Sequence, residues 1–539
     1  MSDAVRQRSA TLKDFSGGLN NFWDESVIAD NELPFLENLE FTPRGALTSR
    51  PPIWSPANRT LPEANVHFDL LGYFIEEDGD RFAVYTSPTK TYIYNLNNTW
   101  TQIWNQRAAD FVQYQGYIIM CRTNGAGAYW GPNGAQVWNG TAWVTGAATE
   151  TIATMPAAAG LELHQERLFA FGPRGTATQS IMYWSNITGE VAGQPQKDWR
   201  YWETATSFSS VNSGDGQWIT GLVAGYNNLT VFRNDSTYEY TFSNLPELGT
   251  MSKVQEGIGA ENQQCIVRYE NALIVLSADQ TYSYYNGVFT SLNDQKVRFE
   301  NKVLPSTLNV PYALSVLGAR LIVFYAGNIY VLQLKTGTWS SWSTNTGFVY
   351  SRTVPSPTDI IDKALEAWAI SNNADTGDSK VYRICDHYHE GDGPEQMTCS
   401  IRTKIYDFNT PNEWKRLYWW AAEIMAVGNV TARVFPVSLD TTTQTTWDWL
   451  ETFTWDELLT SVVGWDNPAP KPFNVKTTST FTWVKPERLN LKLDHALRFR
   501  RVYFELEVTT DGTAATAPAQ IFSITPMIGA KASISERIS

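Results

Sequence analysis

Charged residues and histidines are scarce in this sequence. Of its 539 residues, 18% are Asp, Glu, Lys or Arg, and only five are histidine. A mainly helical protein with many surface salt bridges needs more charge than this, so the composition disfavours that class. The shortage of histidine also leaves few candidates for general acid–base catalysis.

Cysteines and long apolar runs are scarce as well. The four cysteines, Cys121, Cys265, Cys385 and Cys399, are widely separated, which implies no disulfide framework. No stretch approaches the ~18 uninterrupted apolar residues of a transmembrane helix. The basic N-terminus lacks the apolar run that a secretory signal requires. We therefore expect a chain made in a reducing cytosol that stays soluble or assembles.

Sequence motifs of catalysis are also missing. There is no phosphate-binding glycine loop with Lys-Ser/Thr, no Gly-x-Ser-x-Gly elbow and no His-Glu-x-x-His. The segment SGDGQW from Ser213 superficially resembles a box of sialidase-like propellers, but its glycine and tryptophan fall too early and it occurs once. A glycosidase needs two facing carboxylates, and 55 acidic residues offer no basis for choosing a pair. We expect no catalytic residues and no cofactor.

One cluster has the residue types of a metal site. Cys385, His387, His389 and Cys399 lie within 15 residues, and alternation along a strand would put the two histidines on one face. Four such side chains are able to hold zinc tetrahedrally. However, the spacing is unlike that of common structural zinc sites. The segment is also acidic and rich in glycine, as a linker between domains would be. The sequence therefore predicts no metal.

Aromatic residues, by contrast, are abundant. The chain has 22 Trp, 25 Tyr and 25 Phe, a composition that favours strands over helices. With 43% hydrophobic residues it can bury a large core, and its length allows two or three domains or one repeated architecture. The net charge of −14 argues against a surface that grips nucleic acid. An acidic channel wall would still let DNA slide past without binding.

An internal repeat predicts the fold. A short strand, a tight turn with Gly or Asn and a strongly apolar strand recur from Phe111, Leu161, Ile219, Cys265 and Ala313, and more weakly from Leu70 and Ala364. A third strand with alternating aromatics usually follows, as in TYIYNL and TYEYTF. In several copies a fourth strand that contains tryptophan follows, as in NNTWTQIW, NGTAWVTG and KTGTWSSWS. Four such strands make a propeller blade. We predict an all-β chain with a β-propeller of six to seven blades, the alternative being unrelated hairpins of a sandwich.

The sequence divides into three parts. Residues 1–60 form an N-terminal docking arm, 61–390 the β-propeller, and 391–539 a β-sandwich domain predicted from five longer strands. The last part carries a Trp-rich insertion near 441–475. Its tryptophans are expected at the tip or at an intersubunit contact, or else as packing residues of a long hairpin: Trp447, Trp449, Trp455 and Trp465.

The most specific motif lies in residues 14–53. An aromatic-x-Gly-Gly opening is followed by Gly-x-Leu-x-x-Arg-Pro, and the residues that carry the pattern are Phe15, Gly17, Gly18, Leu19, Gly45, Leu47, Arg50 and Pro51. The glycine pair permits a sharp turn or a close approach, and the prolines after Arg50 stiffen the exit. Such a stretch suits docking on a partner, or a strand that closes the propeller.

This stretch resembles the N-terminus of tail proteins from short-tailed, double-stranded-DNA bacteriophages. These are the tail nozzle, or tail tubular protein B, and the related tail-stabilisation proteins. The resemblance implies a virion structural protein and not an enzyme: a homo-oligomeric ring, usually of six copies, attached below the portal and its adaptor ring. The ring would extend the DNA-ejection channel, with viral DNA passing unbound and a tail fibre or tailspike as a further partner. The alternatives are a tail-tip hub of a long-tailed phage and a carbohydrate-binding or carbohydrate-cleaving propeller.

Overall fold

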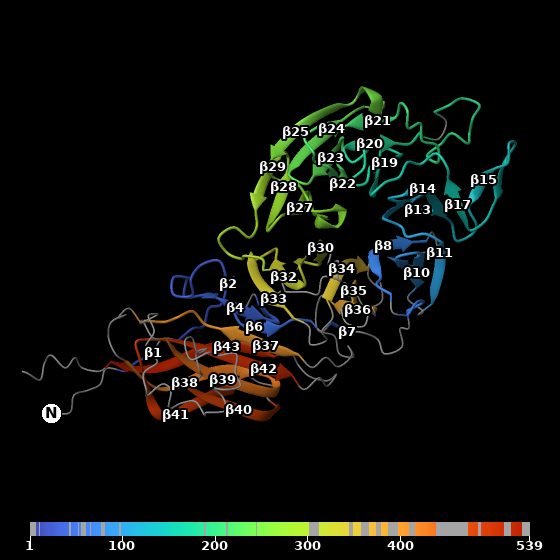
Figure 1. The fold of residues 1–539 in the computed structure, drawn as a ribbon. Helices are drawn as coiled ribbons and strands as arrows, with labels where there is room; N and C mark the ends of the chain where they lie inside the picture. Colours follow the sequence, from blue (N-terminus) through green and yellow to red (C-terminus); the bar gives the residue numbers. More distant parts are fainter. Residues whose placement is uncertain are drawn as a thin grey trace, which may run out of the picture.

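The computed structural model describes residues 7–9, 11–42, 45–51, 53–54, 61–64, 66–76, 81–95, 99–187, 190–211, 214–243, 245–300, 312–343, 349–356, 366–372, 379–385, 397–408, 415–437, 473–482, 487–510 and 519–530. Within these ranges every regular element is a strand, apart from two 3-10 turns, η1 (Pro246–Leu248) and η2 (Gln263–Cys265). None of these residues forms a helix long and apolar enough to cross a membrane. Figure 1 shows two bodies, a propeller and a smaller sandwich.

Five propeller blades are built from strands that follow one another in the chain, and each is a four-stranded antiparallel sheet. Blade 1 holds β8 (Asp69–Ile75), β9 (Arg81–Thr86), β10 (Thr91–Asn95) and β11 (Trp100–Trp104); blade 2 holds β12 (Asp110–Tyr114), β13 (Tyr117–Arg122), β14 (Gly125–Trp130) and β17 (Thr149–Ile152). Blade 3 holds β18 (Gly160–His164), β19 (Arg167–Phe171), β20 (Ile181–Trp184) and β21 (Phe208–Ser210); blade 4 holds β22 (Ile219–Ala224), β23 (Asn228–Arg233), β24 (Ser236–Thr241) and β25 (Thr250–Glu256). Blade 5 holds β26 (Ile266–Tyr269), β27 (Ala272–Ser277), β28 (Gln280–Tyr285) and β29 (Val288–Ser291).

Two further blades close the ring. Blade 6 holds β30 (Ala313–Leu317), β31 (Arg320–Tyr325), β32 (Asn328–Gln333) and β33 (Thr338–Trp342). Blade 7 holds β34 (Val349–Ser356), β35 (Glu366–Asn372) and β36 (Ser379–Cys385), and its fourth strand is β7 (Ile53–Trp54) from the N-terminal region. The inner strand β34 lies between β30 and β8, so blade 7 joins blade 6 to blade 1. The predicted all-β propeller is confirmed, with seven blades.

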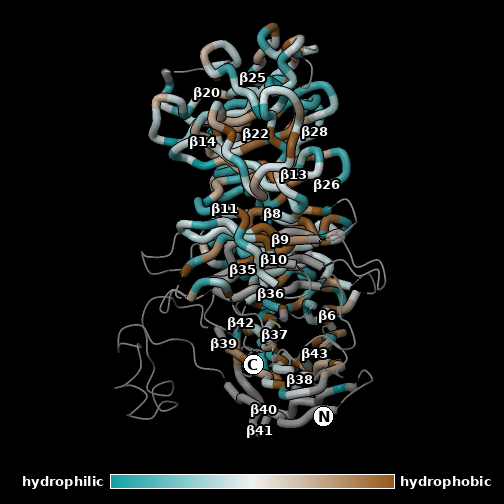
Figure 2. Tube along the Cα trace, turned by 90° about the vertical axis from the view of Figure 1, so that its right-hand side faces the viewer, coloured by the Kyte–Doolittle hydropathy of each residue, from teal (hydrophilic) through white to brown (hydrophobic). Residues whose placement is uncertain are grey.

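The blades follow the predicted pattern of burial. The second strand of blade 3 is buried at all five positions, because both faces of its sheet are covered by neighbouring blades. Figure 2 shows hydrophobic residues in strands such as β8, β9 and β22, and hydrophilic residues in the outer loops.

One strand prediction was wrong. The segment NGTAWVTG is not the fourth strand of blade 2. It belongs to an added hairpin of β15 (Gln136–Trp138) and β16 (Trp143–Thr145). The two tryptophans of this hairpin pack together with ring centroids 5.6 Å apart. The fourth strand is β17, which pairs with β14. A turn followed by Trp marks any exposed hairpin, and only the pairing partner distinguishes an insertion from a blade strand.

The second body is the predicted β-sandwich. One sheet runs β41 (Glu487–Phe499), β38 (Lys415–Met425), β43 (Gln520–Ala530), β6 (Leu47–Ser49) and β5 (Leu39–Phe41), with β1 (Gln7–Ser9) also on β43. The other runs β4 (Phe35–Glu37), β37 (Thr398–Arg402), β42 (Arg501–Thr510), β39 (Val427–Val437) and β40 (Phe473–Thr482). Side chains from the two sheets meet in one core, where the rings of Trp420 and Phe504 lie 5.2 Å apart.

The two bodies share a sheet and a core. Strand β4 pairs with β33 of blade 6, at Glu37 opposite Ser341, so the second sandwich sheet continues into the propeller. The same hydrophobic cluster contains Leu506 of the sandwich and Trp339 of blade 6. The propeller and the sandwich are therefore packed together through the N-terminal strands, which lie between them in Figure 1.

Candidate functional site

The N-terminal motif residues are packed inside the protein. Phe15, Leu19 and Leu47 are all buried in the shared core. Strand β2 (Gly18–Leu19) runs parallel to β3 (Glu32–Leu33) and lies against β33 of blade 6. Their role toward a partner stays a prediction, because in this chain their side chains contact the chain itself.

The glycine pair is required by this packing. Gly18 has φ +65°, and a Cβ at this position would lie 2.8 Å from the carbonyl oxygen of Trp339. A Cβ at Gly17 would lie 2.8 Å from the carbonyl oxygen of Asn31. Real Cβ atoms do not approach backbone so closely. Gly18 therefore lets the N-terminal segment lie directly on blade 6, and Gly17 lets the segment pack against its own turn before β3. Gly45 also has a positive φ, +89°, in the turn that leads to β6.

Arg50 and Asn38 form a buried polar junction between the two bodies. The Nε of Arg50 donates to Oδ1 of Asn38 at 2.8 Å, and its other nitrogens donate to the carbonyls of Pro51 (2.9 Å) and Ser343 (3.0 Å). The Nδ2 of Asn38 donates to Oγ of Ser343 at 2.8 Å and to the carbonyl of Thr398 at 2.7 Å. Ser343 follows blade 6 and Thr398 begins β37 of the sandwich. One Asn–Arg pair thus ties the N-terminal segment to both bodies.

Two ion pairs strengthen the same junction. The buried carboxylate of Glu40 in β5 accepts from Nε of Arg320 in blade 6 at 2.9 Å and from Nη2 at 2.8 Å, and from Nε2 of Gln333 at 3.1 Å. Glu32 in β3 pairs with Lys296, in the segment after blade 5. Burial alone would raise the pKa of Glu32, but the Lys296 ammonium, with two further donors, holds that pKa below its usual value. These charged groups are compensated where they are buried, as stability requires.

An exposed aromatic loop projects between the buried parts of the segment. We define the aromatic loop as residues 20–31, between β2 and β3. Phe22 is 46% exposed, Trp23 49% and Val27 66%, and the rings of Phe22 and Trp23 pack edge to face at 5.2 Å. The sequence analysis missed these residues, although the segment NNFWDESV has two large aromatic residues among polar ones inside the motif.

The aromatic loop is held in place by its surroundings. The side chain of Asn21 donates to the carbonyl of Arg298 at 3.0 Å and accepts from the Arg298 N–H at 2.8 Å. Arg298 lies in the segment that follows blade 5. On the sandwich side, Glu25 pairs with Arg402 at 3.1 Å and Asp30 with Lys404 at 2.5 Å. The loop is thus anchored to both bodies while its aromatic residues stay exposed. Exposed aromatics on a fixed backbone are suited to partner binding, because little ordering entropy remains to be lost.

The other predicted site residues fall into two groups. Outside the described residues lie His387, His389 and the tryptophans of the insertion: Trp447, Trp449, Trp455 and Trp465. Cys385 ends β36 of blade 7, whereas Cys399 is buried in the sandwich with its Sγ 3.4 Å from the carbonyl oxygen of Asn38. In the described part of the chain no three His, Cys, Asp or Glu side chains gather as a metal site would need.

The sialidase-like segment has a structural use. Asp215 accepts from Nη1 of Arg233 at 2.7 Å, and the Arg233 side chain is completely buried in blade 4. Asp215 therefore neutralises a buried guanidinium, as a buried cation requires.

Polar side chains of the inner strands bridge neighbouring blades. Asp110 at the start of β12 accepts from the N–H of Leu161 in blade 3 at 3.0 Å. Gln263 of η2 exchanges two bonds with the backbone of Leu222 in blade 4, at 2.8 and 2.9 Å. The pKa of Glu162 in β18 is raised to about 8, by burial and next by the Asp110 carboxylate. The inner strands are thus cross-linked by side chains as well as packed.

Comparisons with known proteins add a fold likeness only. No protein-family model matches the chain, and no curated protein matches it. Among solved structures, the AfRom2 CNH domain is 12% identical, with a TM-score of 0.39 over 62% of this chain and 100% of its own. An inactive virginiamycin B lyase from Staphylococcus aureus with quinupristin is 9% identical (TM-score 0.41; 62% of this chain, 99% of that one). The WD40 β-propeller domain of Doa1 is 5% identical (TM-score 0.38; 62% and 97%). Likenesses this distant say nothing about activity or partners.

Proposed function

We propose that this protein is a structural component of a bacteriophage virion. It would form the nozzle of a short tail as a ring of copies attached below the portal's adaptor ring. The proposal combines the motif in residues 14–53, which resembles that family, with the aromatic loop that this motif holds. In this proposal the protein works through interfaces, and no side chain needs a catalytic role.

The observation that carries the proposal is the exposed Phe22–Trp23 pair on an anchored backbone. An aromatic side chain has roughly 150–250 Å² of surface to bury, and Phe22 and Trp23 still expose 46% and 49% of theirs. At ~25 cal/mol per Å² the pair would contribute several kcal/mol to an interface. Tryptophan is also among the residues that are enriched in interface hot spots. The aromatic loop is therefore the surface that we assign to the adaptor ring or to a neighbouring copy.

The charge of the chain is compatible with a DNA conduit. A net charge of −14 repels phosphate, so DNA would pass through the ring without binding it. A tail protein that gripped DNA would hinder ejection. In this proposal the net negative charge lets DNA pass through the ring, and the aromatic loop holds the ring in the tail.

The test is assembly with and without the aromatic loop's side chains. We expect the purified chain to form rings, visible by negative-stain electron microscopy, on adding adaptor rings. Phe22→Ala/Trp23→Ala is expected to weaken that association at least ~100-fold with little change in thermal stability, since both side chains are exposed. The matched control is Phe208→Ala, an equally exposed aromatic on blade 3.

Two results would contradict the proposal. Normal association of the double variant would exclude the aromatic loop as the contact. Absence of the protein from purified virions, measured by mass spectrometry, would exclude the structural role itself.

A further inference from the structure

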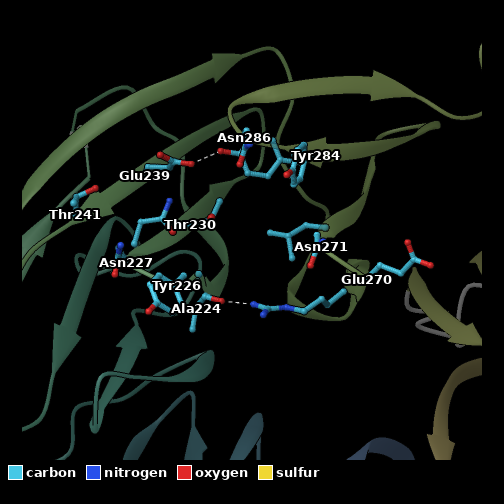
Figure 3. Close-up of a pocket in the computed structure, with 15 residues that line it drawn as sticks. Ala224, Tyr226, Asn227, Thr230, Glu239, Thr241, Glu270, Asn271, Tyr284 and Asn286 are labelled. Atoms are coloured by element: carbon cyan, nitrogen blue, oxygen red, sulfur yellow. Dashed lines mark hydrogen bonds between the residues drawn. The ribbon is translucent and has the colours of Figure 1, made fainter.

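A cavity of about 500 Å³ opens between blades 4 and 5, and none of the residues that line it belongs to the N-terminal segment. Its walls are formed by turns that join strands within the two blades and by side chains of the adjoining strands. Blade 4 contributes the β22–β23 turn around Tyr226, and blade 5 contributes the turns around Asn271 and Asn286. Figure 3 shows the blade 4 side chains on one side and the blade 5 side chains on the other. The volume lies within the range of small-ligand sites.

Two hydrogen bonds across the cavity fix its walls. The hydroxyl of Tyr284 in blade 5 donates to the Glu239 carboxylate in blade 4. The guanidinium of Arg268 in blade 5 donates to the carbonyl of Ala224 in blade 4. Both bonds are drawn in Figure 3, at opposite ends of the space between the blades. Burial, and next the Glu239 carboxylate, raises the pKa of Tyr284, so this hydroxyl keeps its proton and the bond persists at neutral pH.

The lining combines exposed tyrosines with side-chain amides. Tyr226 is 95% exposed and Tyr285 is 53% exposed, although tyrosine normally buries much of its ring. Four asparagines line the same cavity: Asn227, Asn228, Asn271 and Asn286. Each amide offers two donors and one acceptor oxygen. Flat apolar rings beside many neutral donors and acceptors match a pyranose, which has an apolar face and a rim of hydroxyls.

We propose that this cavity is a binding site for a neutral oligosaccharide. Tyr226 and Tyr285 would stack on sugar rings, and the asparagines would bond the hydroxyls. The lining groups that are charged at neutral pH are two carboxylates, Glu239 and Glu270, and one guanidinium, Arg268, which already bonds Ala224. An acidic sugar or a nucleotide would meet this negative excess, so the charge selects a neutral ligand. This site is independent of the proposed assembly role.

The experiment is calorimetric titration of the full-length protein with defined saccharides. The neutral probes are maltohexaose, cellohexaose and mannohexaose, and the acidic probe is a galacturonic acid hexamer. We expect at least one neutral probe to bind with a Kd of about 0.1–5 mM, more tightly than the acidic probe. Tyr226→Ala/Tyr285→Ala should weaken binding at least ~10-fold, the loss of about 1.4 kcal/mol.

Controls separate a binding defect from a folding defect. Tyr73→Ala removes an exposed tyrosine from blade 1 and should leave binding unchanged. Unaltered thermal unfolding of the double variant would show that the blades are intact. The proposal is overturned if no neutral probe binds at about 10 mM, if the double variant binds normally, or if the acidic probe binds more tightly. None of these outcomes depends on ring formation or on incorporation into virions.

Discussion

Blades 1–5 and the junction of blades 6 and 7 with the sandwich are built in opposite ways. In blades 1–5 every strand pairs with strands of the same blade, so paired strands stay within one stretch of the sequence. At the junction, β7 pairs with β36, β4 pairs with both β33 and β37, and β6 pairs with β43. The two parts of the molecule therefore form contacts of very different sequence separation.

This difference shows where specific polar contacts are needed. A hairpin brings its strands together at a small cost in chain entropy, and an apolar face then suffices to hold it. Strands from opposite ends of the chain carry a larger closure cost and can slip in register. The junction has buried, geometrically demanding groups at those places, such as Arg50 with Asn38 and Glu40 with Arg320. Apolar packing stabilises the blades, whereas the junction is stabilised by apolar packing and by buried hydrogen bonds and ion pairs.

The largest expected effect comes from breaking the Arg50 junction. Arg50→Met removes the buried guanidinium that donates to Oδ1 of Asn38 and to the carbonyls of Pro51 and Ser343. Because several buried acceptors lose a donor at once, we expect a loss of about 3–5 kcal/mol in the free energy of unfolding. Urea denaturation should then show the sandwich and the propeller unfolding in separate transitions. The control is Arg107→Met, which removes an exposed ion pair with Asp69 and should cost at most ~1 kcal/mol. A variant that keeps the wild-type midpoint and a single transition would refute this role of the Arg50 junction.

A smaller effect is expected from filling the space at Gly18. Gly18→Ala combines a positive φ with a clash against the backbone of Trp339, and we expect a cost of about 2–4 kcal/mol. Gly175 in blade 3 has φ +78° but open space around its Cβ position, so Gly175→Ala should cost only about 1 kcal/mol. Differential scanning calorimetry of both variants measures the contribution of the close contact. Equal melting temperatures would mean that the N-terminal segment does not need to lie directly on blade 6.

The smallest effect concerns pH and lies within blade 3. In the folded chain Glu162 has a pKa of about 8, above its ordinary value of 4.5. Between these two values the unfolded carboxyl releases its proton while the folded one keeps it. Stability should therefore fall as pH rises from about 4.5 to about 8 and level off above that. The carboxyl is crowded enough to have a raised pKa, but the residue as a whole keeps part of its surface exposed. We therefore expect only about 1–2 kcal/mol in total.

Substitution of Glu162 checks this assignment. Glu162→Gln should remove that part of the pH dependence. Compared with the wild type in urea titrations, the variant should therefore gain more stability at pH 8 than at pH 5. Glu203→Gln, on an exposed turn between β20 and β21, should leave the slope as in the wild type. An unchanged slope in Glu162→Gln would place the origin of any pH dependence elsewhere.

Particular elements show what could be predicted from the sequence. The hairpins of blades 1–6 were visible because an apolar second strand and a turn residue are local signals, as in β18–β19. The β15–β16 insertion carried the same signal and was misassigned. The sequence analysis left open that residues 14–53 close the propeller, but no local signal indicated that Ile53 pairs with Ile384. The candidate site divides in the same way: the motif around Phe15 was found, but the exposure of Phe22 and Trp23 depends on which rings the core covers.

The sequence by itself determined the all-β class, the blade repeat and the presence of a second β domain. These follow from strand periodicity and turn chemistry, which act between residues that are close in the chain. Only the tertiary structure decided that the N-terminal segment completes blade 7 and the sandwich. It also decided that Arg50 is buried and that Tyr226 and Tyr285 stand beside one cavity. Burial and juxtaposition depend on contacts between strands of different blades and of the two bodies, which local periodicity does not encode.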